Sequence, residues 1–161
     1  MEVLTLAGGL AAGYMLAQNQ PKQDLNRKGA SVFVLGCFDP RFSDNLAWFL
    51  THNEKLHDNY DLFCLAGASL GVVQTDIPAW GQTFIDHLNL AIQLHDIKEV
   101  WVFDHFDCGF YKAHFQQETD KTPGLHLSSM MELQAMLAES HPNLGFKGYI
   151  INLDGKIAQH I

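Results

Sequence analysis

Ser31-Val-Phe-Val-Leu35 is a short, mostly apolar stretch that ends at Gly36. A stretch of this length, rich in β-branched and aromatic residues and closed by glycine, is typical of a strand buried on both faces. The stretch Glu99-Val-Trp-Val-Phe103 has the same character. We expect further strands at residues 61–65, at residues 146–153 and, as an edge strand after the turn signal Asp154-Gly155, at residues 156–161.

Apolar residues recur at helical spacing in three regions between these strands. The regions are residues 45–56, residues 76–95, where Asp76 and Pro78 mark a helix start, and residues 129–139, where Ser129 and Glu132 have capping-box spacing. Apolar strands that alternate with helices predict the α/β class. We therefore expect a single domain over residues 31–161, with a mainly parallel central sheet covered by helices.

Polar residues follow two of the expected strands at corresponding points. Cys37 lies two residues past the first strand, and His105 lies two residues past the third. Ligands of parallel α/β sheets bind beyond the carboxyl ends of the strands, so both side chains should reach the same edge. Cys108 follows His105 three residues later.

Cys37, His105 and Cys108 together offer two thiolates and one imidazole. These are three ligands for one zinc ion per chain, and three protein ligands leave a fourth position open, as in catalytic rather than structural zinc sites. The spacing also fits a simpler alternative without metal, in which a buried cysteine follows a strand and the polar residues near it pair at the surface.

Asp39 and Arg41 lie close to the first of these cysteines. A zinc ion lowers the pKa of a bound water toward neutrality, and Asp39 could accept a hydrogen bond from the resulting hydroxide. Arg41 would keep Asp39 ionised and oriented through a charge-assisted pair. We expect Asp39 and Arg41 to be catalytic, with the alternative that Asp39, released by Arg41, becomes the fourth ligand and closes the site.

The remaining cysteine and histidines are expected to be structural. Cys64 falls inside an expected strand, where a free cysteine acts as a small hydrophobic residue. The other histidines are expected at the surface or at helix ends; they are His52, His57, His87, His95, His114, His126, His141 and His160.

The composition of the chain argues against several classes of protein. The formal net charge of −8 and the lack of clustered Lys and Arg argue against a nucleic-acid partner. Three cysteines are an odd number, which does not fit a disulfide framework, and free thiols as metal ligands fit a reducing compartment. We therefore expect an intracellular location, in the cytoplasm or an organelle matrix.

The first twenty residues differ from the rest of the chain. Residues 3–17 carry no charge and are predicted as an apolar helix within residues 1–20, followed by a polar linker at residues 21–30. The segment is short for a membrane span and has Glu2 in place of a basic start. It is expected to pack on a partner subunit or a larger complex, with a membrane anchor or a cleaved targeting segment as alternatives.

The order Cys37-x-Asp39-x-Arg41, then Ala66-Gly67, then His105-x-x-Cys108-Gly109 resembles the beta class of carbonic anhydrases over about residues 30 to 155. The resemblance implies zinc on the two cysteines and the histidine, and an Asp–Arg catalytic dyad. It implies reversible hydration of carbon dioxide to bicarbonate, and at least a homodimer whose N-terminal helices reach across to the neighbouring subunit.

Three residues, in two places, depart from the family pattern. Cys64 and Leu65 stand where the family usually has Arg-Asn, and Asp104 stands where it usually has Gly. A carboxylate at Asp104 would either orient the ring of His105 or add charge beside it. Two alternative functions stay open: a hydrolase of carbon disulfide or carbonyl sulfide on the same scaffold, and a non-catalytic, zinc-stabilised subunit of a larger assembly.

Overall fold

Five strands form one sheet at the centre of the protein. The computed structural model describes residues 29–116 and 123–161. Four strands run parallel, and the last strand pairs antiparallel at one edge. In their order across the sheet the strands are β2 (Tyr60–Cys64), β1 (Val32–Gly36), β3 (Glu99–His105), β4 (Gly145–Ile151) and β5 (Ile157–Gln159).

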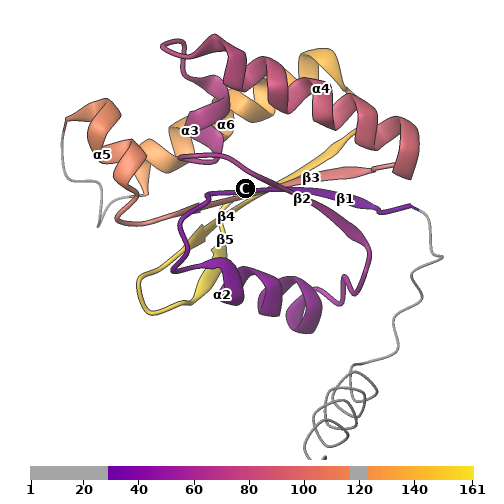
Figure 1. Ribbon diagram of the computed structural model, residues 1–161, viewed down its shortest axis with the longest axis horizontal. Coiled ribbons are helices and arrows are strands. Elements are labelled where there is room, and N and C mark those ends of the chain that lie inside the picture. The colour runs from indigo at the N-terminus through magenta and orange to yellow at the C-terminus, as the bar shows by residue number, and fades with distance from the viewer. Residues whose placement is uncertain (1–28, 117–122) are drawn as a thin grey trace, which may run out of the picture.

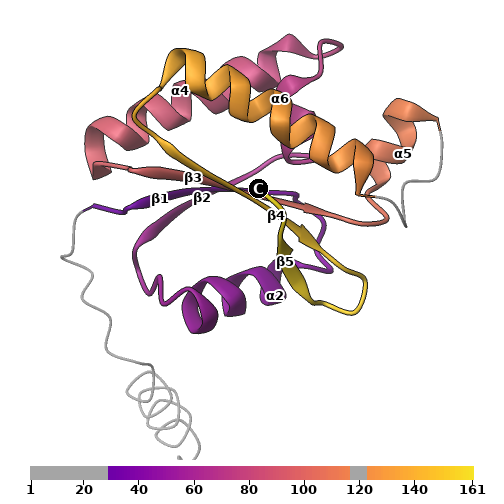
Figure 2. The same ribbon diagram turned by 180° about the vertical axis from the view of Figure 1, so that it is seen from behind.

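Helices cover both faces of the sheet, which confirms the predicted fold class (Figure 1). One face carries α3 (Ser69–Val73), α4 (Pro78–His95) and α6 (Gly124–Ser140). The other carries α2 (Ser43–Trp48), which continues into the π-helical turn η1 (Phe49–Asn53). Figure 2 shows the same layers from the side of β4 and β5. The short helix α5 (Gly109–Phe115) lies beyond the end of the sheet at which β3 finishes.

The strand register places the ends of the parallel strands level with one another. Gly36, the last residue of β1, pairs with Cys64 on one side and with Phe103 on the other. Strand β3 is two residues longer than predicted and ends at His105, opposite Ile151 of β4. Cys37 and His105 therefore leave neighbouring strands at the same edge, as expected.

Alternation along β3 divides its side chains between two separate cores. Val100 and Val102 belong to the core beneath α4 and α6. Trp101 and Phe103 belong to the core against α2. Because successive side chains of a strand point to opposite faces, Asp104 belongs to the first face and His105 to the second.

The helix boundaries correct several predictions. Helix α6 begins at Gly124 rather than at Ser129, so Ser129 is a buried residue of the helix and not its cap. Leu94, an apolar residue near the end of the predicted helix of residues 76–95, is 60% exposed. The five-residue α3 and the seven-residue α5 were not predicted, because they are too short to show an apolar period.

The predicted helix of residues 1–20 and most of the predicted linker lie outside the described residues. Within residues 29–116 and 123–161, no helix is both long enough and apolar enough to cross a membrane.

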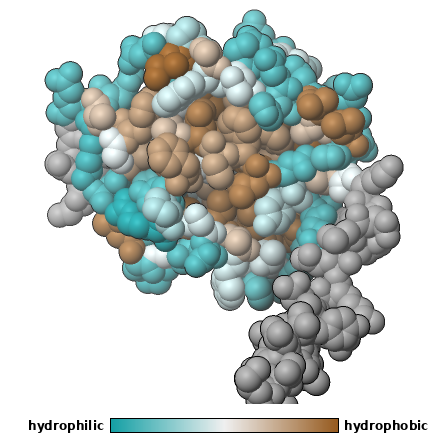
Figure 3. Space-filling view, viewed as in Figure 1, coloured by the Kyte–Doolittle hydropathy of each residue, from teal (hydrophilic) through white to brown (hydrophobic). Residues whose placement is uncertain are grey.

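An apolar surface lies along the edge strand β2. Leu62 of β2 is 53% exposed, and Cys64, which was expected to be buried, is exposed as well. Trp48 of α2 is a further exposed apolar side chain. Figure 3 shows apolar residues gathered across the middle of this face. The exposure follows from the topology, since β2 has a neighbouring strand on one side only.

Truncation of a core residue of α4 tests the packing of the larger core. Phe84 is fully buried and contacts the rings of Phe33 and Phe63. We expect Phe84→Ala to lower the free energy of unfolding by about 3–5 kcal/mol, because the surrounding side chains cannot fill the space that the ring leaves. Leu94→Ala on the same helix is the matched control and should change stability by less than about 0.5 kcal/mol. Chemical denaturation measures both, and equal losses would contradict this description of the core.

Candidate metal centre

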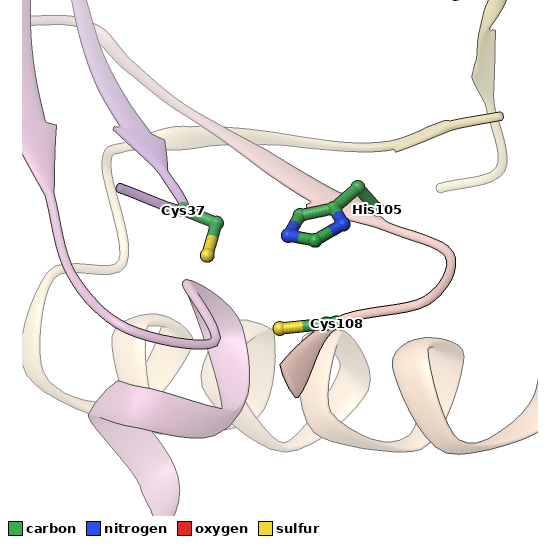
Figure 4. Close-up of side chains that lie close together, drawn as sticks. All are labelled: Cys37, His105 and Cys108. Atoms are coloured by element: carbon green, nitrogen blue, oxygen red, sulfur yellow. The ribbon is translucent and has the colours of Figure 1, made fainter. Parts of the chain in front are cut away.

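Cys37, His105 and Cys108 meet at the carboxyl edge of the sheet (Figure 4). The two sulfur atoms and a ring nitrogen of His105 all lie within 4.8 Å of one another. Cys37 directly follows β1, His105 ends β3, and Cys108 precedes the first residue of α5. In the part of the chain that the structure describes, no other group of three histidine, cysteine or acidic side chains converges in this way.

The imidazole of His105 is oriented for metal binding by a backbone carbonyl. Its Nδ1 lies 2.8 Å from the oxygen of Phe106. A carbonyl can only accept, so Nδ1 carries the proton and Nε2 keeps its lone pair. Nε2 is buried and has no hydrogen-bond partner among the described residues. Phe42 packs against the ring with the centroids 4.4 Å apart. A buried lone pair without a donor fits a metal ligand.

The two sulfurs share hydrogen bonds with each other and with nearby backbone. Hydrogen bonds from Cys108, and from the N–H groups of Gly67 and Asp39, lower the pKa of Cys37 to about 4 against the opposing effect of burial. The bond with Cys37, together with burial, raises the pKa of Cys108 above its usual range. Two sulfurs and one imidazole nitrogen in a buried site are a donor set that suits zinc.

A tight turn after β2 brings Gly67 to the sulfur of Cys37. Gly67 has φ +72°, and a Cβ at this position would lie 2.5 Å from Cδ1 of Phe110. The following residue, Ala68, also has a positive φ, of 39°. Only glycine accommodates both this backbone conformation and the close approach of the Phe110 ring. The expected motif Ala66-Gly67 therefore supplies an N–H group to the metal centre.

Asp39 and Arg41 form the predicted ion pair next to the three ligands. Arg41 donates from Nε to Oδ1 of Asp39 at 3.0 Å and from Nη2 to Oδ2 at 2.8 Å. The backbone N–H of Arg41 also donates to Oδ1, at 3.0 Å. Oδ2 of Asp39 lies 3.9 Å from Nε2 of His105. The hydrogen bonds from Arg41 hold the pKa of Asp39 below its usual value, so this carboxylate stays ionised beside the metal position.

A second carboxylate on Arg41, that of Asp107, was not anticipated from the sequence. Asp107 lies between the two ligands of the His-x-x-Cys segment, and its Oδ2 accepts from Nη1 of Arg41 at 3.0 Å. Lys112 pairs with the other oxygen of Asp107. The hydrogen bonds from Lys112 and Arg41 lower the pKa of Asp107. The position of Asp107 between two candidate ligands was the one sign of a role in the sequence. The sequence does not show its partner, because Arg41 lies 66 positions away.

Two expectations about neighbouring residues were wrong. Asp104 does not contact His105, because its side chain points to the opposite face of β3, and the Phe106 carbonyl orients the imidazole instead. His126, expected at the surface or at a helix end, lies in the first turn of α6 but is fully buried, 3.3 Å from Oδ2 of Asp104.

An apolar cavity adjoins the ligands on the α2 side of the sheet. Cys37 and His105 form part of its wall, and the exposed Cys64 lies along the same wall. The other lining residues are mostly apolar, and they are Gly36, Phe42, Ser43, Leu46, Ala47, Leu50, Tyr60, Leu62, Phe103 and Ile151.

The fold is that of the beta-carbonic anhydrases. A carbonic anhydrase from Streptococcus mutans aligns over 99% of this chain and 99% of its own, with a TM-score of 0.59 and 18% identity. A beta-carbonic anhydrase from Aspergillus fumigatus aligns over 95% of this chain and 89% of its own, with a TM-score of 0.50 and 15% identity. At these identities the similarity establishes the fold alone.

Two sequence relatives come from the genus Rickettsia. No protein-family model matches the chain. An uncharacterized protein of Rickettsia conorii is 30% identical over 145 residues, which cover 88% of this chain and 76% of that protein. An uncharacterized protein of Rickettsia bellii is 31% identical over 134 residues, which cover 81% of each. The chain therefore belongs to the same protein family as these two rickettsial proteins, and it has a beta-carbonic anhydrase fold.

Proposed function

We propose that the protein is a zinc lyase of the carbonic anhydrase type, which hydrates carbon dioxide reversibly to bicarbonate and a proton. The observation that carries this proposal is the ionised Asp39 carboxylate, held by Arg41 at 3.9 Å from the buried Nε2 of His105. A structural zinc site has no use for a fixed carboxylate beside its ligands.

Cys37, His105 and Cys108 would hold the zinc ion through two sulfurs and Nε2. Zinc bound there would act as a Lewis acid and lower the pKa of water, so that hydroxide is available to attack carbon dioxide near neutral pH. The residues of the chain provide orientation. Asp39 holds Oδ2 beside Nε2 of His105, where it would accept a hydrogen bond from the attacking hydroxide.

Arg41 fixes the direction of the Asp39 carboxylate. The guanidinium binds both oxygens of Asp39, and it is itself held by Asp107 on its other edge. Because a forked guanidinium matches a carboxylate in one plane, Asp39 has little freedom to rotate. A preorganised acceptor does not have to be reoriented when the reaction begins.

The apolar cavity beside Cys37 and His105 suits a small substrate without charge. Carbon dioxide is linear and apolar, and the rings of Phe42 and Phe103 in the wall offer it no competing hydrogen bonds. Carbon disulfide and carbonyl sulfide share this shape, so the hydrolase alternative is tested by the same assay with those two substrates.

We also propose that two copies associate along β2. Among the described residues, β2 has no strand on its outer side, and the exposed Leu62 and Cys64 extend the apolar surface there. An exposed apolar edge strand is a ready site for pairing, and a second copy would remove it from water. Residues 3–17 remain our proposed further contact with that copy or with a larger complex, and an intracellular reducing compartment remains the proposed location.

Zinc content tests the three ligands directly. We expect purified wild-type protein to hold one zinc per chain and Cys108→Ser to lose it, because a hydroxyl is a far weaker zinc ligand than a thiolate. Cys64→Ser is the matched control, since Cys64 lies outside the ligand group, and it should keep its zinc. Elemental analysis of both variants gives the answer, and a Cys108→Ser protein with full zinc would refute the assignment.

Stopped-flow measurement of carbon dioxide hydration tests the activity. We expect Asp39→Asn to keep its zinc and to lower kcat about 10²-fold or more, because the amide is neutral and no longer accepts in the same way. Asp154→Asn is the control, since Asp154 is a surface residue paired with Lys156. A zinc-loaded wild-type protein without activity toward carbon dioxide, carbon disulfide or carbonyl sulfide would instead favour the non-catalytic subunit.

The oligomeric state tests the surface along β2. We expect Leu62→Lys to convert a dimer to monomers, because it places a charge in the apolar surface. Leu153→Lys is the control, since Leu153 is similarly exposed, at 57%, but lies after β4. Light scattering after size-exclusion chromatography measures both, and a monomeric wild-type protein would contradict the proposed dimer.

A further inference from the structure

Asp104 is a buried acidic residue on the face of β3 that turns away from His105. Its relative exposure is 1%. Its Oδ1 accepts from the backbone N–H of Ser69 at 3.1 Å. Its Oδ2 accepts from the hydroxyls of Ser69 at 2.6 Å and Tyr111 at 2.7 Å, and lies 3.3 Å from Nδ1 of His126. We call these four residues the Asp104 cluster.

Stability alone does not account for this cluster. Val100 and Val102 precede Asp104 on the same face of β3, and both are fully buried in an apolar core. A buried polar cluster is often no more stabilising than apolar side chains of the same volume. What the cluster does provide is a set of directed contacts between β3, α3, α5 and α6, each of which contributes one member.

Tyr111 connects the Asp104 cluster to Cys108, and Ser69 connects it to Cys37; we call these two connections its arms. Tyr111 is fully buried and lies in the first turn of α5, three residues after Cys108. Cys108 and Tyr111 are packed together in one buried cluster, and the backbone N–H groups of Phe110 and Tyr111 face the sulfur of Cys108. Because the hydroxyl of Tyr111 is held by Asp104, the start of α5 is fixed where these two N–H groups meet the sulfur.

The other arm leads to Cys37. Ser69 is fully buried and begins α3, two residues after Gly67. Cys37 packs against the buried cluster that contains Leu70 of α3, and the N–H group of Gly67 faces its sulfur. The Asp104 carboxylate accepts from both the backbone N–H and the hydroxyl of Ser69. These two hydrogen bonds fix the tight turn that contains Gly67.

His126 closes the cluster on the side of α6. Its ring lies against that of Tyr111, with the centroids 4.1 Å apart, and its exposure is 0%. Oδ2 of Asp104 accepts from Nδ1, while Nε2 has no hydrogen-bond partner among the described residues. The bond to Asp104 is therefore what ties the His126 ring, and with it α6, to the cluster.

We propose that Asp104 is a positioning residue for the metal centre, which acts through Ser69 and Tyr111 to hold three backbone N–H groups against the sulfurs of Cys37 and Cys108. This inference rests on the zinc site of the proposed function and extends it. Hydrogen bonds to a ligand sulfur orient it and reduce the negative charge that it donates, so they set both metal affinity and the acidity of the metal.

The removal of one hydroxyl tests the arm to Cys108. We expect Tyr111→Phe to weaken zinc binding about 10- to 100-fold, measured by competition with a chelator. Tyr149→Phe is the matched control, because Tyr149 is also buried but lies on the opposite face of the sheet, stacked on Phe103. In the cobalt-substituted protein, the sulfur-to-metal charge-transfer band should shift in Tyr111→Phe and stay unchanged in Tyr149→Phe.

The second arm supplies an independent variant. Ser69→Ala removes the hydroxyl that donates to Asp104, and we expect the same direction of change in zinc affinity and in the cobalt spectrum. Should Tyr111→Phe fail to fold, Ser69→Ala carries the test alone. A purely structural cluster predicts lower thermal stability in both variants with zinc affinity and spectrum as in the wild type, and that result would overturn the proposal.

Amide hydrogen exchange of the metal-free protein separates this inference from the proposed function. We expect faster exchange at Gly67, Phe110 and Tyr111 in Asp104→Asn, and no such change in Tyr149→Phe. If the wild type bound no zinc, the proposed function would fail while this local loosening would still support the positioning role. Unchanged exchange at all three amides would overturn the positioning role whether or not zinc binds.

Discussion

The parallel pairing of β1 with β3 is the constraint on which the rest of the structure depends. It sets Gly36 opposite Phe103, so that the residues that follow emerge at one edge of the sheet. Cys37 and His105 are 68 positions apart in the sequence, yet they need no long loop to meet. The third ligand, Cys108, arrives by a tight turn from the same strand. Both strands are buried on both faces, which gives the two ligands a rigid support.

Alternation along β3 then allows one strand end to serve two purposes. His105 faces the α2 side, with the apolar cavity and the Asp39 carboxylate. Asp104, its immediate neighbour, faces α3 and α6, where its hydrogen bonds reach the turns that follow β2 and β3. The candidate metal centre and its backbone support are thus on opposite faces of the sheet, and the charge of Asp104 points away from the candidate ligand His105.

The sequence predicts the sheet and the ligand group well, because both depend on local patterns. Apolar stretches that end in glycine or in polar residues predicted four of the strands. Because the carboxyl ends of parallel strands share one edge of the sheet, Cys37 was expected close to His105. The exposure of Cys64 and the burial of His126 were missed for a different reason. Cys64 is exposed because β2 is an edge strand. The order of strands across a sheet cannot be deduced from the sequence of any one strand. His126 is buried because Asp104 offers it a partner from 22 positions away.

The short helices α3 and α5 could not be predicted from local sequence either. Neither is long enough to form alone, so each depends on contacts made elsewhere in the fold. Their starts are also where the backbone N–H groups approach the two sulfurs. Arg41 adds a further tie, because Asp107, from the turn between His105 and Cys108, binds the guanidinium that orients Asp39. The turn that delivers the third ligand therefore also fixes the carboxylate beside the metal position, so a displacement of this turn would disturb ligand and carboxylate together.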